Sequence, residues 1–161
     1  MVTLERLHAD HASALLAFER ENRAWFARSV PDRGDAYFAQ FADRHRALLA
    51  EQETGAIHFH VVRDGNGELI GRANLVDAAA GTAEVGYRIG QRAAGRGVAT
   101  AAVGELCRLA VSAYGLHTLT AVTTLDNGAS RAVLRHNGFA EAGGTEVGGR
   151  PGVRYRRELS A

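Results

Sequence analysis

A strand, a basic glycine turn and the start of a helix follow one another between residues 83 and 100. The strand reads Ala83-Glu84-Val85-Gly86-Tyr87-Arg88-Ile89, and the turn and helix start read Arg92-Ala93-Ala94-Gly95-Arg96-Gly97-Val98-Ala99-Thr100. Backbone N–H groups at such a turn and at a helix N-terminus point toward one spot, and glycine lets an anion approach the main chain closely. The segment predicts a phosphate cradle, although the glycine spacing alone also suits an ordinary turn that feeds a helix.

A second motif lies about 30 residues further on. Asn127 and Ser130 are three residues apart at the start of a predicted helix that ends at Asn137-Gly138-Phe139. This spacing lets both side chains face one ligand channel. Asn127 can also cap the helix, and the two roles are compatible because they use different groups.

The spacing R-x-x-G-x-G from Arg92 to Gly97, together with the second motif, resembles the acetyl-CoA signature of the GNAT N-acetyltransferases. The resemblance spans nearly the whole chain, and the segment Asn22-Arg23-Ala24-Trp25-Phe26 looks like that of the RimJ/RimL-type branch. It implies an α/β fold with a mostly antiparallel, twisted mixed sheet of six to seven strands, about four flanking helices and a splayed strand pair that holds acetyl-CoA. The implied reaction moves an acetyl group from acetyl-CoA to a primary amine by direct attack in a ternary complex.

The resemblance also assigns the cofactor contacts. Main-chain groups of the strand containing Val85, Tyr87 and Ile89 would pair with pantetheine like an added strand. Asn127 would contact pantetheine as well. The pyrophosphate would lie over Arg92 and over the backbone of the glycine turn and helix start, which comprises Gly95, Arg96, Gly97, Val98, Ala99 and Thr100.

Two residues are candidates for catalysis. Glu84 shares a strand face with Gly86 and Arg88, and we expect it to take the proton from the attacking amine, directly or through water. Its alternative is a surface or ion-paired glutamate. Many related enzymes carry a tyrosine that protonates the leaving thiolate, but that position is Leu134 here. Ser130 is therefore the candidate acid, with a plain helix serine as its alternative.

A backbone N–H near Tyr87 could meet the oxyanion formed on the acetyl carbon, as the family's strand geometry implies. Asn22, Trp25 and Phe26 are the candidate acceptor-binding residues, with core packing of the aromatic pair as the alternative. The acceptor is expected to be a protein N-terminal α-amine, or a small-molecule or antibiotic amine.

Other site types are not favoured. His58 and His60 share a strand face but have no further ligand at metal-binding spacing, so we expect no metal. Cys107 lies on an apolar helix stripe and reads as a small buried hydrophobe. Dinucleotide binding requires βαβ units where hairpins are predicted, and a third glycine where Thr100 stands. A CoA-binding regulator that lacks catalysis stays open because of Leu134.

Composition sets broader bounds. The 161 residues form a single predicted domain, and 46% hydrophobic with 23% charged residues is typical of a globular protein. A single cysteine and the lack of a long apolar run predict a cytoplasmic protein with no membrane partner. A net charge of +1 argues against general nucleic-acid binding. Exposed strand edges leave room for a homodimer.

The elements that must position these residues follow from periodicity and turn chemistry. Asp64-Gly65-Asn66-Gly67 predicts a hairpin turn, and Asp10 is the predicted cap of the first helix. The predicted strands are 3–7, 57–63, 68–76, 84–89, 119–124 and 153–159, and the predicted helices follow residue 10, span 38–49 and 98–114, and end at 137. The glycine-rich segment 143–152 is predicted as a connection.

Overall fold

The computed structural model describes residues 1–159 and gives an α/β fold with one seven-stranded sheet. The helical elements are η1 (Ala9–His11), α1 (Ala12–Glu21), α2 (Arg23–Ala27), α3 (Asp35–Ala39), α4 (Phe41–Glu53), η2 (Gln91–Ala93), α5 (Val98–Ser112) and α6 (Gly128–His136). The strands are β1 (Thr3–Arg6), β2 (His58–Arg63), β3 (Leu69–Ala79), β4 (Thr82–Ile89), β5 (Thr118–Thr124), β6 (Ala140–Val147) and β7 (Arg150–Glu158). None of the helices within residues 1–159 has the length and apolar character needed to cross a membrane.

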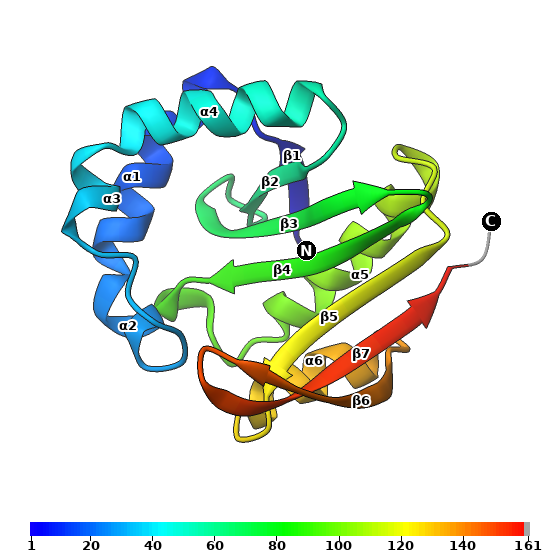
Figure 1. The fold of residues 1–161 in the computed structure, drawn as a ribbon. Helices are drawn as coiled ribbons and strands as arrows, with labels where there is room; N and C mark the ends of the chain where they lie inside the picture. Colours follow the sequence, from blue (N-terminus) through cyan, green and yellow to red (C-terminus); the bar gives the residue numbers. More distant parts are fainter. Residues whose placement is uncertain (160–161) are drawn as a thin grey trace.

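The strands lie in the order β1-β2-β3-β4-β5-β7-β6 (Figure 1). All neighbours are antiparallel except β4 and β5, which run parallel and pair only from Thr82–Thr118 to Glu84–Thr120. Beyond Glu84 the two strands separate, so the predicted splayed pair is confirmed at the centre of the sheet.

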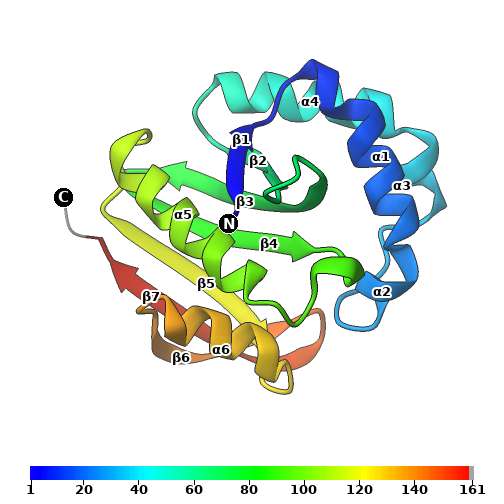
Figure 2. The same ribbon diagram turned by 180° about the vertical axis from the view of Figure 1, so that it is seen from behind.

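Helices α5 and α6 lie across one face of the sheet, whereas α1, α3 and α4 gather near β1 to β3 and α2 lies beside the end of β4 (Figure 2). The main core joins α5 and α6 to the sheet through residues such as Val103, Leu106, Leu119 and Leu134. A smaller apolar cluster around Leu15, Phe41 and Val61 holds α1 and α4 on β2. Two cores thus fix the sheet from both sides and leave the gap between β4 and β5 open.

The hairpin between β2 and β3 has the predicted turn. Asp64 Oδ1 accepts hydrogen bonds from the backbone N–H groups of Asn66 at 2.9 Å and Glu68 at 3.0 Å. The antiparallel meander of β2, β3 and β4 that follows is also as predicted.

Three local predictions are wrong. Asp10 does not cap α1, because a 3-10 turn precedes that helix and His8 accepts the N–H of Asp10 instead. The predicted helix across 38–49 is two helices, because Gln40 has φ −105° and ψ 17° and breaks the run. The segment 143–152 is not only a connection: β6 pairs with β7 through a turn at Gly148 and Gly149, which both have positive φ.

Candidate active site

A cavity of about 870 Å³ opens where β4 and β5 separate. Its walls come from β4 (Val85 to Ile89), β5 (Ala121 to Thr124), the turn before α5, and α6. On its β5 side, β4 pairs only as far as Glu84, so backbone groups of its later residues face the cavity. Such an unpaired strand edge can bind an extended ligand as an added strand.

The turn before α5 forms one end of this cavity. Gly95 and Gly97 both have φ of +75°, and a Cβ built at either would meet nothing within 4 Å. Gly97 is the N-cap residue of α5 and, as a glycine, has no side chain that could cap the helix. Within residues 1–159, the N–H groups of Val98, Ala99 and Thr100 have no hydrogen-bond acceptor. Open space in front of unsatisfied N–H groups at a helix N-terminus suits an anion.

Arg92 and Arg96 lie on the other side of the turn and line a separate, smaller cavity. Arg92 is ion-paired with Glu21, and its side chain is 78% exposed. The structure therefore brings Gly95 and residues 97–100, but neither Arg92 nor Arg96, to the wall of the large cavity. The guanidinium groups remain next to the cradle rather than inside it.

The start of α6 faces the same cavity. The Asn127 side chain accepts a hydrogen bond from the Ser130 N–H at 3.1 Å, so the predicted cap is present. The Tyr87 hydroxyl donates to Ser130 Oγ at 3.2 Å, which links β4 to α6 across the gap. Burial raises the pKa of Tyr87, and the hydrogen bond to Ser130 opposes that effect. Leu134 lines the same cavity and is 1% exposed.

The aromatic pair of α2 also lines the cavity. Phe26 is buried, and Trp25 donates its indole N–H to the Ile89 carbonyl at 3.2 Å. Asn22 is not brought to this cavity. Its amide is used inside the fold, because it donates to the Phe18 carbonyl at 3.0 Å and accepts from the Gln91 N–H at 2.9 Å. The Asn22 side chain thus links the end of α1 to the loop after β4, outside the large cavity.

Glu84 is the last residue of β4 that pairs with β5, and it does not line the cavity. Its side chain is on the strand face that also carries Gly86, which does line it. Burial and the nearby Asp77 raise the pKa of the Glu84 carboxyl, against an opposing effect of Arg154. A carboxylate with a raised pKa is better matched to proton transfer near neutral pH.

The structure also places the cysteine and histidine candidates. Cys107 is buried, and burial raises the pKa of its thiol. His60 Nδ1 lies 2.9 Å from the Ala73 carbonyl and Nε2 lies 2.6 Å from the Tyr114 hydroxyl, while His58 stacks on the Tyr114 ring. Both ring nitrogens of His60 are thus engaged within the fold, and His58 Nδ1 lies 3.4 Å from a guanidinium nitrogen of Arg6.

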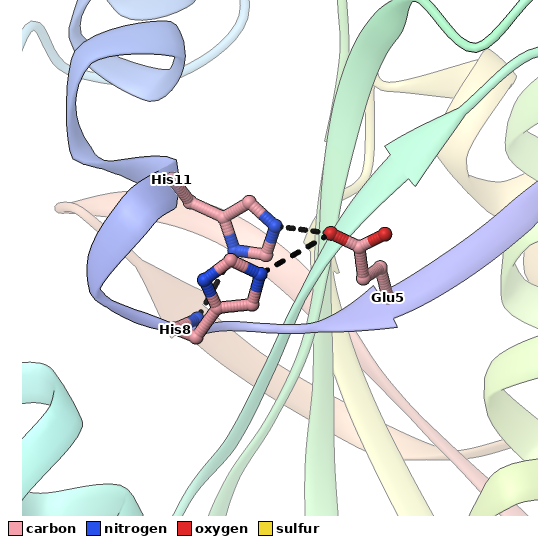
Figure 3. A group of neighbouring side chains, drawn as sticks. All are labelled: Glu5, His8 and His11. Carbon is pink, nitrogen blue, oxygen red and sulfur yellow. Dashed lines mark hydrogen bonds and ion pairs between the residues drawn. The ribbon is translucent and has the colours of Figure 1, made fainter.

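A different group brings possible metal ligands together. Glu5, His8 and His11 place their ligand atoms within 4.8 Å of one another (Figure 3). Nδ1 of His8 accepts the Asp10 N–H and Nδ1 of His11 accepts the His8 N–H. Both neutral rings must then carry their proton on Nε2, the nitrogen that faces Glu5, so these rings donate to the carboxylate and are not set up to bind a cation.

Sequence reasoning missed three arginines that line the cavity: Arg28, Arg88 and Arg150. Arg28 follows α2, and Arg150 follows the β6–β7 turn, whose Gly148 lies against Pro31. Nothing in the local sequence signals that these two segments meet. Arg88 was visible as a member of the Glu84 face, but its neighbours were not.

Comparison with known proteins agrees with this geometry. The acetyltransferase (GNAT) domain family matches residues 1–140. A search of curated proteins by sequence found no match. Many solved structures share the fold.

Three of these structures illustrate the acetyltransferases that share the fold. A ribosomal-protein-S5-alanine acetyltransferase from Vibrio fischeri has a TM-score of 0.89 at 20% identity, with 98% of this chain and 92% of that chain covered. RimJ of Mycobacterium smegmatis, in complex with a CoA disulfide, has a TM-score of 0.86 at 26% identity, with 98% and 81% covered. A spermidine N-acetyltransferase from Vibrio cholerae, in complex with CoA and spermine, has a TM-score of 0.78 at 19% identity, with 98% and 95% covered.

The family match covers most of the chain. The matched part includes both the splayed β4–β5 pair and the glycine turn at the N-terminus of α5. The chain therefore belongs to the GNAT family of acetyltransferases, whose acetyl donor is acetyl-CoA.

Proposed function

We propose that this protein transfers the acetyl group of acetyl-CoA to a primary amine by direct attack within a ternary complex. The acceptor is a protein N-terminal α-amine or the amine of a small molecule, since proteins of this fold include both ribosomal-protein and spermidine acetyltransferases. The single observation that carries the proposal is the cavity between β4 and β5, which ends at the unsatisfied N–H groups of α5.

The residues fit a polyanionic donor. Within the described chain the cavity lining contains no carboxylate, and the glycine turn leaves open space at its end. In our proposal the N–H groups of Val98, Ala99 and Thr100 hold the diphosphate, with Arg92 and Arg96 beside them. The edge of β4 at Val85, Tyr87 and Ile89 binds the pantetheine arm, together with Asn127. Acetyl-CoA, when bound, supplies an acetyl thioester that an amine can attack.

Two groups of this chain would manage protons. Glu84 accepts the proton of the incoming ammonium through water along the Gly86 side of β4, which leaves the amine neutral. Ser130 Oγ holds a proton inside the cavity, and the Tyr87 hydroxyl that donates to it keeps that proton oriented toward the leaving sulfur. A backbone N–H near Tyr87 would stabilise the acetyl oxygen as negative charge develops on it.

The Ser130 assignment can be tested by substitution. Ser130→Ala and Tyr87→Phe should each lower kcat by roughly 10- to 100-fold, because each breaks the proton-donating pair. The Kd for CoA should change by less than about threefold, since neither hydroxyl touches the proposed diphosphate site. Ser112→Ala, at the exposed end of α5, is the matched control and should behave as wild type. Equal kcat for all four proteins would remove Ser130 and Tyr87 from the mechanism.

A binding module without catalysis is the second candidate, because Leu134 occupies the position of the tyrosine found in many relatives. Thiol release from acetyl-CoA, measured across a panel of amines, separates the two functions. The proposed enzyme releases thiol with at least one amine. Saturable CoA binding with no release on any amine would instead establish the regulator.

A further inference from the structure

The lining of the large cavity carries positive charge from three separate parts of the chain. Arg28, Arg88 and Arg150 line it, and no aspartate or glutamate of residues 1–159 does. Arg150 is ion-paired with Asp126. Arg28 lies 5.0 Å from the centre of the Trp25 ring and forms no ion pair within the described chain. The charge on this wall is therefore only partly balanced.

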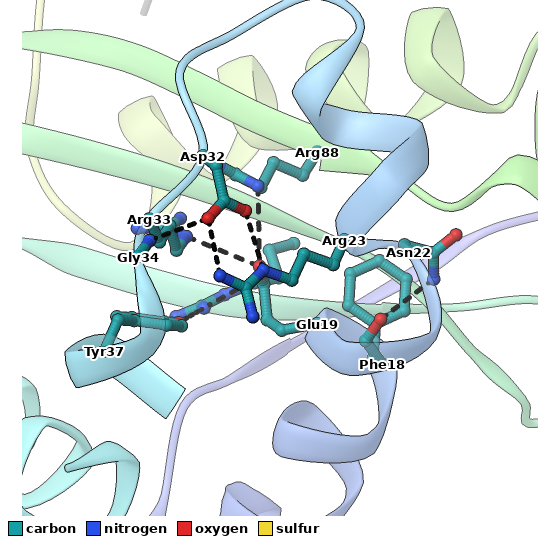
Figure 4. Close-up of polar contacts among 10 residues, drawn as sticks. Phe18, Glu19, Asn22, Arg23, Asp32, Arg33, Gly34, Tyr37 and Arg88 are labelled. Atoms are coloured by element: carbon teal, nitrogen blue, oxygen red, sulfur yellow. Dashed lines mark hydrogen bonds and ion pairs between the residues drawn. The ribbon is translucent and has the colours of Figure 1, made fainter. Parts of the chain in front are cut away.

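A buried cluster behind Arg88 increases the excess. Glu19 is 1% exposed and is shared by Arg33, Arg72 and Arg88, each with its nearest guanidinium nitrogen 3.4 Å from a carboxylate oxygen. Figure 4 shows Arg33 and Arg88 converging on Glu19 from different segments. Three guanidinium groups on one carboxylate leave about two positive charges unmatched, and 3.4 Å is longer than a strong charge-assisted hydrogen bond.

The nearby carboxylate of Asp32 does not correct this imbalance. It is engaged by Arg23, whose Nε and Nη2 atoms lie 3.0 Å and 2.8 Å from its two oxygens. Uncompensated buried charge is costly, so the cluster is stabilised when a further anion approaches it. Arg88 is the member of the cluster that also lines the cavity.

The position of Arg88 separates it from the diphosphate site. Val85 and Tyr87 face the core formed with α5, whereas Arg88 is on the opposite face of β4 and contacts Glu19 of α1 and the ring of Phe26. The N-terminus of α5, where the phosphates would lie, belongs to the first face. Arg88 is therefore on the face of β4 away from the proposed diphosphate site, and Arg28, which follows α2, lines the same cavity.

We infer that the acceptor is an amine that carries an anionic group close to the amine, and that Arg88 and Arg28 bind this group. The inference rests on the proposed acetyl transfer and narrows its acceptor class. The anionic group is a carboxylate with two chemical sources: the α-carboxylate of a free amino acid, or an acidic side chain next to a peptide N-terminus. Polyamines such as spermidine, which are polycations, should be poor acceptors.

Matched acceptor pairs test this directly. We would compare serine with serinamide, and the amidated peptide Ser-Asp-Ala-Ala with Ser-Asn-Ala-Ala, because each pair differs in a carboxylate but not in shape. The anionic member of one pair should have a kcat/KM at least tenfold higher, and the pair that shows it identifies the source. This preference should shrink with added salt. Spermidine should be slower than the preferred acceptor.

Variants assign the effect to the residues. Arg88→Gln and Arg28→Gln should each reduce the preference to about twofold or less, mainly through acceptor KM, and should leave the Kd for CoA unchanged in calorimetry. Arg28 is exposed, so its variant keeps the test valid if Arg88→Gln unfolds. Arg108→Gln, on the exposed face of α5, is the control that removes one positive charge elsewhere. Binding of the unreacted acceptor to the CoA-loaded protein gives a second readout besides turnover.

Different experimental outcomes would refute the anionic acceptor class and the acetyl transfer itself. Turnover with equal rates on neutral and anionic acceptors, or fastest turnover on spermidine, overturns the acceptor class and leaves acetyl transfer standing. Weaker CoA binding in Arg88→Gln and Arg28→Gln also overturns it, because the arginines would then hold cofactor phosphates. Absence of CoA binding by the wild-type protein overturns the proposed function and this inference with it.

Discussion

The glycine at the N-cap of α5 offers a sharp test, because replacing it should weaken cofactor binding far more than it weakens the fold. Gly97→Ala adds one methyl group at a residue with φ +75°, in a space where a Cβ meets nothing within 4 Å. The fold then bears only the strain of a left-handed alanine, about 1 kcal/mol. The methyl group, however, keeps a phosphate from approaching the N–H groups of Val98 to Thr100.

The expected loss in affinity follows from the contacts at stake. One or two hydrogen bonds from N–H groups to a charged phosphate contribute about 1.5–3 kcal/mol each, so losing one raises the Kd for CoA roughly 10- to 150-fold. Titration calorimetry of CoA into each protein measures this change. Thermal unfolding without ligand measures the cost to the fold separately.

Gly55→Ala is the matched control. Gly55 has φ +84°, a Cβ there also meets nothing within 4 Å, and the residue follows α4, outside the large cavity. Both variants should lose a similar amount of stability, but only Gly97→Ala should lose affinity. Equal Kd values for the two variants would refute the assignment of the diphosphate to this turn.

Three further predictions concern ionisable groups. Glu84→Gln should lower turnover at neutral pH by roughly 100-fold and leave the Kd for CoA unchanged. In the wild-type protein, kcat/KM should fall as the pH drops through the raised pKa of Glu84, because the carboxylate becomes protonated. A pH–rate profile that the substitution leaves unaltered would eliminate Glu84 as the base. Burial lowers the pKa of His60 to about 4 from 6.5, so on acidification His60 of the unfolded chain is protonated before His60 of the folded chain. The free energy of unfolding should therefore be highest above about pH 6.5 and fall by up to about 3 kcal/mol as the pH is lowered to 4. Urea unfolding at pH 7 and pH 4.5 checks this, and His60→Gln should flatten the dependence; an equal decline in the variant contradicts it. Glu19→Gln leaves three buried or partly buried guanidinium groups without their carboxylate, so it should lower the free energy of unfolding by about 3–5 kcal/mol. The control Glu141→Gln, on the surface, should lower it by less than about 1 kcal/mol. Similar losses for the two variants in urea melts would show that the cluster carries no such charge imbalance.

The cradle and its flanking strand were predictable because they are encoded locally. Gly95 and Gly97 take the left-handed conformation that glycine favours, and the apolar stripe of α5 begins directly after them. The hairpin at residues 64–67 and the cap by Asn127 follow from local chemistry in the same way. Each of these features needs only a few consecutive residues to be recognised.

Features that depend on distant segments were not predictable. Arg28 and Arg150 are 122 positions apart in the chain and share a cavity wall only because the loop after α2 meets the β6–β7 turn. Asn22 was predicted to contact the acceptor, but its side chain accepts a hydrogen bond from the Gln91 N–H, 69 positions away in the chain, and nothing in the local sequence signals that bond. Strand β6 was missed because its mostly exposed, glycine-containing sequence shows no alternation of apolar and polar residues, and only pairing with β7 makes it a strand.

A crystal structure of the protein with CoA would locate the diphosphate itself. We expect diphosphate oxygens within hydrogen-bond distance of the N–H groups of Val98 to Thr100, with the pantetheine arm lying between β4 and β5. Ordered CoA with its diphosphate on the Arg28 and Arg88 side of β4, or outside the β4–β5 cavity altogether, would contradict this expectation.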